Sequence, residues 1–216
     1  DPLVKILRSG DDATAIALAP GNLPYLAVIV GHGRTLQRLT VTGALGAEAT
    51  LDPPGGRLLS PLSETGSVVR LAERPGDLVI EWWDIPRMSR RAHATLSRPC
   101  ARPRALPLGD DDAVLVSCAD GTLLKVSPNA AAVVLPQRGW VPTEALTRGA
   151  LLRRDGPRAA IAVLDARGGL VAEAPTGTGT RDVRIRTDAR VVRFGRYLPE
   201  EEQRWLRDTL AGMVSR

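Results

Sequence analysis

A short segment that begins with glycine recurs four times in this chain at nearly constant spacing. Its glycines are Gly33, Gly76, Gly121 and Gly169, which lie 43, 45 and 48 residues apart. Each glycine is followed by a short run rich in apolar residues. Self-similarity at a fixed period of this size is the mark of a fold built from repeated supersecondary units. The repeat therefore predicts one short strand and one tight turn in every copy.

Three further short apolar runs accompany each copy. The run before the glycine is Tyr25–Val30, Ser67–Leu71, Ala113–Ser117 or Ala159–Leu164. The run upstream of that is Ala15–Ala19, Arg57–Ser60, Arg104–Leu108 or Ala145–Leu152. The run downstream of the glycine is Ala47–Leu51, Ala92–Leu96, Ala131–Leu135 or Asp182–Arg186. Four strands per copy predict an all-β fold, a β-propeller of four four-stranded blades.

The predicted propeller occupies residues 1–187, with repeat units of about 8–52, 53–97, 98–137 and 138–187. The composition agrees, because 21 glycines and 17 prolines in 216 residues imply many turns. The two cysteines, Cys100 and Cys118, do not indicate a disulfide framework. We therefore expect a reducing, cytoplasmic location. The apolar runs are too short to cross a bilayer, and the excess of arginine over lysine suggests a bacterial GC-rich genome.

One copy resembles a WD40 repeat. The segment Gly76–Pro86 followed by Arg91–Leu96 is similar to the end of such a repeat, with Trp83 and Asp84 at the Trp-Asp position. The next copy, from Arg104 to Val126, is similar to its first strands and its Asp-Gly turn. The resemblance implies a propeller of more than four blades. Either this chain forms a small ring or it is part of a larger propeller that another polypeptide completes.

Two features favour the second alternative. The chain starts with Asp1 rather than methionine, as expected of a trimmed or excised piece. The run Leu3–Leu7 has the pattern of an outer strand without its blade.

The pattern changes over residues 188–216. Val191–Phe194 is predicted to be one more strand, and Leu198–Val214 an amphipathic helix. Its apolar stripe contains Trp205, Leu206 and Leu210. This helix either packs on the propeller or docks on another subunit.

Signals of catalysis or metal binding are weak. The only histidines, His32 and His93, have no convergent partners in the predicted blades. The run Asp110–Asp112 lacks the spacing of a calcium loop and is expected to form a solvated turn. Gly177–Thr180 is too short for a phosphate loop. We therefore expect no enzymatic activity, no metal and no cofactor.

Arginine clusters are the remaining functional signal. Arg87, Arg90 and Arg91 fall in one connection, and six arginines lie between residues 181 and 196. Such arginines either bind phosphates or pair with nearby acids and protect a sheet edge.

The sequence as a whole predicts a non-catalytic scaffold or recognition module that binds protein subunits in a larger assembly. The expected partner-binding residues are Trp140, Arg87, Arg90 and Arg91 in loops and Trp205, Leu206 and Leu210 on the helix. A basic nucleic-acid-binding module and a propeller-type hydrolase or lyase with a site in the central channel are the alternatives.

Overall fold

The architecture comes from a computed structural model of the chain. It describes residues 13–20, 25–40, 42, 44–61, 63, 65–97, 100, 102–109, 112–146, 148–156, 159–175, 181–186 and 191–198. From residue 174 onward the description is limited to the backbone.

The described residues contain eighteen strands, which form four four-stranded sheets and one two-stranded sheet, all antiparallel. Sheet 1 contains β1 (Ala15–Ala19), β2 (Tyr25–Val30), β3 (Thr35–Thr40) and β4 (Leu45–Thr50). Sheet 2 contains β5 (Arg57–Leu59), β6 (Ser67–Arg74), β7 (Asp77–Asp84) and β8 (Ser89–Leu96). Sheet 3 contains β9 (Arg104–Leu108), β10 (Ala113–Ser117), β11 (Leu123–Val126) and β12 (Val133–Leu135). Sheet 4 contains β13 (Val141–Leu146), β14 (Gly149–Arg154), β15 (Ala160–Asp165) and β16 (Leu170–Pro175). The last pair is β17 (Arg181–Arg186) and β18 (Val191–Leu198).

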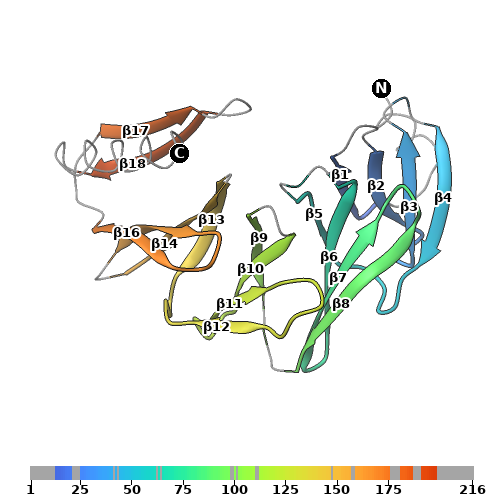
Figure 1. The fold of residues 1–216 in the computed structure, drawn as a ribbon, viewed down its shortest axis with the longest axis horizontal. Helices are drawn as coiled ribbons and strands as arrows, with labels where there is room; N and C mark the ends of the chain where they lie inside the picture. Colours follow the sequence, from blue (N-terminus) through green and yellow to red (C-terminus); the bar gives the residue numbers. More distant parts are fainter. Residues whose placement is uncertain are drawn as a thin grey trace.

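The four large sheets follow one another in a curved row (Figure 1). Their first strands β1, β5, β9 and β13 lie toward the concave side, and the strands then run outward in chain order. Sheets 1 and 4 lie at opposite ends of this row (Figure 1). A meander of four strands arranged radially is a propeller blade. The predicted all-β propeller with four four-stranded blades is therefore confirmed.

The fourth copy of the repeat differs from the prediction by one strand. Gly33, Gly76 and Gly121 each lie between the second and third strands of a sheet, but Gly169 lies between the third and fourth. The expected single run Ala145–Leu152 is interrupted by a turn that contains Arg148, so it contributes to both β13 and β14. Gly156, with a φ of 99°, lies in the connection that corresponds to the other three glycines.

Two further expectations concern the chain ends. The run Asp182–Arg186 is a strand, but it pairs with β18 in a separate sheet instead of completing sheet 4. The predicted strand Leu3–Leu7 and nearly all of the predicted helix Leu198–Val214 lie outside the described residues.

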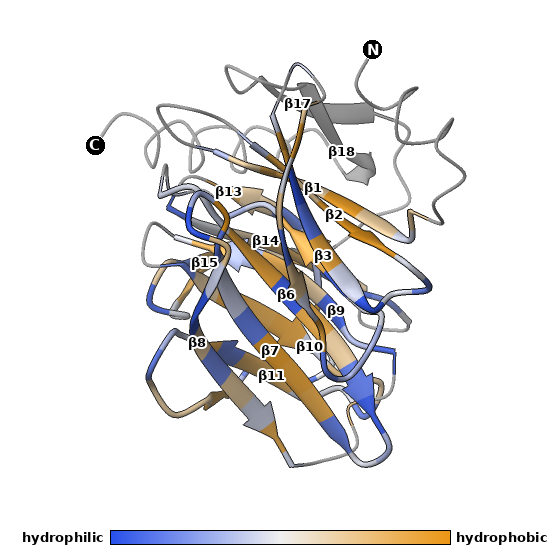
Figure 2. Cartoon of the chain, turned by 90° about the vertical axis from the view of Figure 1, so that its right-hand side faces the viewer, coloured by the Kyte–Doolittle hydropathy of each residue, from blue (hydrophilic) through white to orange (hydrophobic). Residues whose placement is uncertain are grey.

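Neighbouring sheets share apolar cores, and two consecutive tryptophans show how. Side chains alternate between the two faces of a strand. Trp83 of β7 accordingly packs with residues of sheet 1 such as Ile29, and Trp82 packs with residues of sheet 3 such as Val116. A third cluster joins sheets 3 and 4. Figure 2 shows hydrophobic residues concentrated along β7 and β10. Because both faces of an inner blade are covered, β6, β7 and β10 are buried along nearly their whole length.

The recurring glycine has a structural role in sheets 1 and 3. At Gly33 and Gly121 the connection between the second and third strands touches the linker to the next sheet. The amide of Gly55 donates to the carbonyl of Gly33 at 2.7 Å, and Gly139 donates to Gly121 at the same distance. Both turn glycines have φ near +80°, a backbone conformation that favours glycine. The repeat thus marks the turn against which the interblade linker packs.

Candidate partner-binding surface

The connection between β7 and β8 presents one arginine to the solvent. The buried carboxylate of Asp84 accepts hydrogen bonds from the backbone amide of Arg87 at 3.0 Å and from its guanidinium at 2.9 Å. The Arg87 side chain is nevertheless 81% exposed. The turn therefore holds Arg87 in place while leaving most of its guanidinium accessible.

Sheet 1 supports the same connection from the side. Arg38 of β3 donates a hydrogen bond to the carbonyl of Pro86. Its guanidinium carbon also lies 5.1 Å from the centre of the Tyr25 ring, within cation–π range. These two contacts fix a second guanidinium beside Arg87, and neither is evident from the sequence.

Arg90 joins a buried ionic cluster between sheets 1 and 2. It donates to Glu81 at 2.8 Å, and Glu81 also accepts from Arg70 at 2.6 Å and from the Trp83 indole at 3.1 Å. Burial raises the pKa of Glu81, but the hydrogen bonds from Arg90, Arg70 and Trp83 outweigh burial and hold that pKa below its ordinary value. Glu81 is therefore a carboxylate at neutral pH, and Arg90 is anchored at one end while about half exposed.

Arg91 connects sheet 2 to sheet 3. It donates to the Ser67 hydroxyl at 2.8 Å and pairs with the Asp112 carboxylate at 3.3 Å. Asp112 also accepts from Ser63, and its carbonyl accepts from the Trp82 indole at 2.6 Å. The acidic run Asp110–Asp112 thus supplies at least one structural carboxylate. Asp112 is buried, contrary to the expectation of a solvated turn.

The outcome is a basic surface at one end of sheet 2. We call Arg38, Arg87, Arg90 and Arg91 the arginine surface. Arg87, Arg90 and Arg91 pair with the buried carboxylates of Asp84, Glu81 and Asp112, respectively, whereas Arg38 is held by the Pro86 carbonyl and the Tyr25 ring. The acids fix the positions of the arginines without covering their outer faces. Guanidiniums held in this way are suited to bidentate contacts with carboxylates or phosphates.

The other predicted site residues are not part of this surface. Trp140 is only 3% exposed and packs in the core between sheets 3 and 4. The guanidinium carbon of Arg154 lies 4.6 Å from its ring centre. This environment favours a structural role for Trp140 over contact with a partner. Trp205, Leu206 and Leu210 lie outside the described residues.

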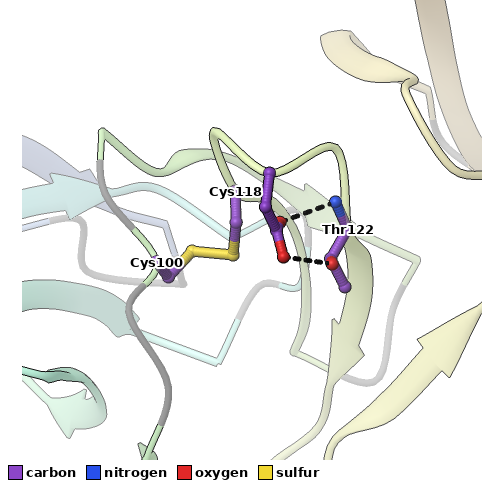
Figure 3. Close-up of a disulfide and its surroundings, with 4 residues drawn as sticks. Cys100, Cys118 and Thr122 are labelled. Carbon is purple, nitrogen blue, oxygen red and sulfur yellow. Dashed lines mark hydrogen bonds between the residues drawn. A yellow bond between two sulfur atoms is a disulfide. The ribbon is translucent and has the colours of Figure 1, made fainter.

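The two cysteines form a disulfide, which corrects the expectation that they are unpaired (Figure 3). Cys100 lies in the linker between sheets 2 and 3, and Cys118 directly follows β10. Both are buried in the core shared by these sheets. Beside them, the Asp120 carboxylate accepts hydrogen bonds from the backbone amide and hydroxyl of Thr122 at 2.9 and 2.8 Å. The spacing of 18 residues carries no pairing signal by itself, since pairing depends on how the linker folds back.

Among the described residues, no group of three or more histidines, cysteines or acids is placed to hold a metal ion. The same part of the chain contains no helix long and apolar enough to span a membrane.

Comparisons with known proteins identify the fold. Neither a protein-family model nor a curated protein matches the sequence. A catalytically inactive virginiamycin B lyase from Staphylococcus aureus, solved with quinupristin, is 13% identical with a TM-score of 0.54, covering 85% of this chain and 70% of that one. A loop-replaced variant of KlHsv2 is 9% identical with a TM-score of 0.50, covering 76% of this chain and 52% of that one. BamB from Moraxella catarrhalis is 17% identical with a TM-score of 0.49, covering 85% of this chain and 59% of that one.

The four four-stranded sheets, together with the similarity to the lyase and to KlHsv2, define the fold class. The chain is a β-propeller protein, and it spans only about half of the KlHsv2 chain. At such low identity the likeness concerns fold alone, and a shared fold does not determine function. The function of this protein therefore has to be inferred from the placement of its own side chains.

Proposed function

We propose that this chain is a non-catalytic recognition module that binds an acidic surface of a protein partner through its arginine surface. The observation that carries the proposal is the placement of Arg87, which is fixed by Asp84 yet mostly exposed. An exposed guanidinium that is already ordered loses little conformational freedom on binding. Arginine is also enriched among the residues that dominate binding energy in protein interfaces.

A protein partner is favoured over nucleic acid by the surroundings of these arginines. Modules that bind single-stranded nucleic acid usually add exposed aromatic side chains on which bases stack. Around the arginine surface, Trp82 and Trp83 are buried. Tyr25 is half-buried and lies against Arg38. The resemblance of Gly76–Pro86 to a WD40 repeat also fits a protein-binding role, because propellers of that kind present loops to other proteins.

Reversing the charge of Arg87 tests the proposal. We expect R87E to reduce recovery of the partner from native cells at least tenfold, because one anchoring cation becomes a repelling anion. The matched control is R153E. Arg153 of sheet 4 forms an exposed ion pair with Asp155, so this variant makes the same charge reversal away from the arginine surface. Quantitative mass spectrometry of the co-purified proteins measures the effect.

Two results would count against the proposal. One is equal loss of all co-purified proteins with R87E and R153E, which would indicate nonspecific charge attraction. The other is tight binding of a generic duplex that weakens steeply with salt and depends on Arg87, which would favour the nucleic-acid alternative.

We further infer that the module works in an oxidising compartment. Disulfides persist outside the reducing cytosol, and the buried Cys100–Cys118 pair supports this inference over the cytoplasmic location expected from the cysteine count. If so, protein trapped from native cells with acid and an alkylating reagent carries no modified cysteine until it is reduced. Modification of both cysteines before reduction would contradict the inference.

The disulfide should also contribute measurably to stability. It joins two residues that are 18 positions apart. A cross-link of that span lowers the entropy of the unfolded chain and so raises the free energy of unfolding by about 3 kcal/mol. We expect the reduced protein, or the C100A/C118A variant, to lose about that amount of unfolding free energy in urea titrations. A loss below about 0.5 kcal/mol would show that the disulfide does not restrain the linker.

A further inference from the structure

Within the described residues, the outer strand of sheet 3 is an edge strand with no strand beyond it. Strand β12 pairs with β11 on one side, through Val133, Val134 and Leu135. It is the last strand of its sheet, so its other edge has no strand partner within the described sheet. An edge strand presents backbone amides and carbonyls that can pair with another chain.

The neighbouring sheets protect the same edge with charges, and sheet 3 does not. The corresponding strands β4, β8 and β16 carry Glu48, the pair Arg90 and Arg91, and Glu173. By contrast, residues 126–137 contain no charged side chain. Val133 and Val134 are 55% and 62% exposed, and the preceding Ala130 and Ala131 are exposed as well. Charged side chains are a common means by which proteins block unwanted strand pairing, so this edge is open to it.

Apolar side chains of sheet 4 extend the surface beside this edge. Leu135 lies next to the turn between β15 and β16, so close that a methyl group on Gly168 would come within 2.8 Å of it. Lys125 of β11 donates to the carbonyl of Ala166 in that turn at 2.7 Å. Leu170 and Val171, which follow the turn, are exposed. We call Val133, Val134, Leu170 and Val171 together the β12 edge.

We propose that the β12 edge binds an extended, uncharged and mainly apolar peptide segment of a partner protein, which adds to sheet 3 as a fifth strand. Strand addition uses backbone hydrogen bonds for affinity and alternate side chains for selectivity. Here the alternate side chains of the peptide would meet Val133 on one face of the sheet and Val134 on the other. A second copy of the chain is a poorer occupant, because each copy carries a net charge of +5.

This inference is independent of the arginine surface, since it uses a different sheet and different chemistry. Its test uses the full chain and a fluorescein-labelled peptide of alternating threonine and valine with a lysine at each end. We expect saturable binding by fluorescence anisotropy, weakened at least tenfold by V134K. The matched control is T50K, which places a lysine on the exposed end of β4, the outer strand of sheet 1, and is expected to leave binding unchanged.

A second probe separates strand pairing from apolar adhesion. The same peptide with N-methyl groups on alternate residues keeps its side chains but loses the amides of one edge, and we expect it not to bind. Three results would each overturn the proposal: no binding of the unmodified peptide at millimolar concentration, equal binding of both peptides, or a dimer of the chain that V134K dissociates. R87E is expected to leave peptide binding intact, which distinguishes this inference from the proposed function.

Discussion

Replacing Arg70 with alanine is expected to lower the free energy of unfolding by about 3–5 kcal/mol, the range found when one partner of a buried ion pair is removed. Arg70 is fully buried and donates to Glu81 and to the carbonyls of Pro53 and Gly55 in the linker between sheets 1 and 2. The R70A variant would leave Glu81 buried with fewer donors and two carbonyls unpaired. Urea denaturation followed by circular dichroism measures the loss.

The control for this variant lies on the same strand. Arg74 of β6 pairs with Asp52, but both side chains are substantially exposed. Exposed pairs contribute about 0–1 kcal/mol, so R74A should have a small effect. Similar losses for R70A and R74A would contradict the account of the buried cluster.

The same cluster makes a prediction about acid. Because the pKa of Glu81 is lowered by folding, its contribution to stability is complete above the ordinary glutamate pKa of about 4.3. That contribution is lost as the pH falls through the lower pKa of the folded state. The E81Q variant should therefore show a shallower fall in unfolding free energy between about pH 5 and pH 2 than the native chain. An unchanged slope would mean that Glu81 is not held as a carboxylate by its donors.

Gly33→Ala is expected to be the second most damaging of these substitutions, with a loss of about 3 kcal/mol from backbone strain and overpacking together. Gly33 has a φ of 83°, and an added Cβ would approach the amide nitrogen of Gly55 to 2.6 Å. Gly76 has a similar φ of 87°, but its Cβ would meet nothing within 4 Å. G76A should therefore cost only the backbone strain, about 1 kcal/mol.

Gly121 provides an intermediate case. Its Cβ would lie 3.3 Å from the amide nitrogen of Gly139, so G121A should fall between G76A and G33A. The order of the three melting temperatures tests the role assigned to the repeated glycine. Equal losses at residues 33 and 76 would show that the glycine is needed only for its turn and not for the linker contact.

The repeat predicted the fold well because it arises from tight turns, and a tight turn is determined by residues that are close together in the sequence. The first three glycines each mark a tight turn between two short strands, and turn chemistry can be recognised in sequence. The fourth copy was displaced by one strand because a turn that contains Arg148 interrupts an apolar run. Gly149 next to it was a possible turn signal, but an isolated glycine also occurs inside strands. Period alone could not decide between Gly156 and Gly169 as the equivalent position.

The candidate site was only partly predictable for a different reason. Arg87, Arg90 and Arg91 are close in sequence, so their clustering was evident. Arg38 comes from sheet 1 and Asp112 from sheet 3, so their places beside these arginines depend on how the sheets pack. The sequence contained one signal of a buried ionic cluster, which is that Glu81 interrupts an otherwise apolar strand interior. A buried charge without a partner is too costly to persist, so Glu81 implied a cation nearby. The same dependence on packing explains why the disulfide was missed.

The most direct test of the recognition role is photo-crosslinking in native cells. A photoreactive amino acid at the exposed Ser89, between Arg87 and Arg90, keeps the arginines intact, and the same residue at the exposed Asp155 is the control. We expect one discrete protein adduct from position 89, lost when R87E is added, and no such adduct from position 155. No protein adduct at position 89, or an adduct to nucleic acid there, would contradict it.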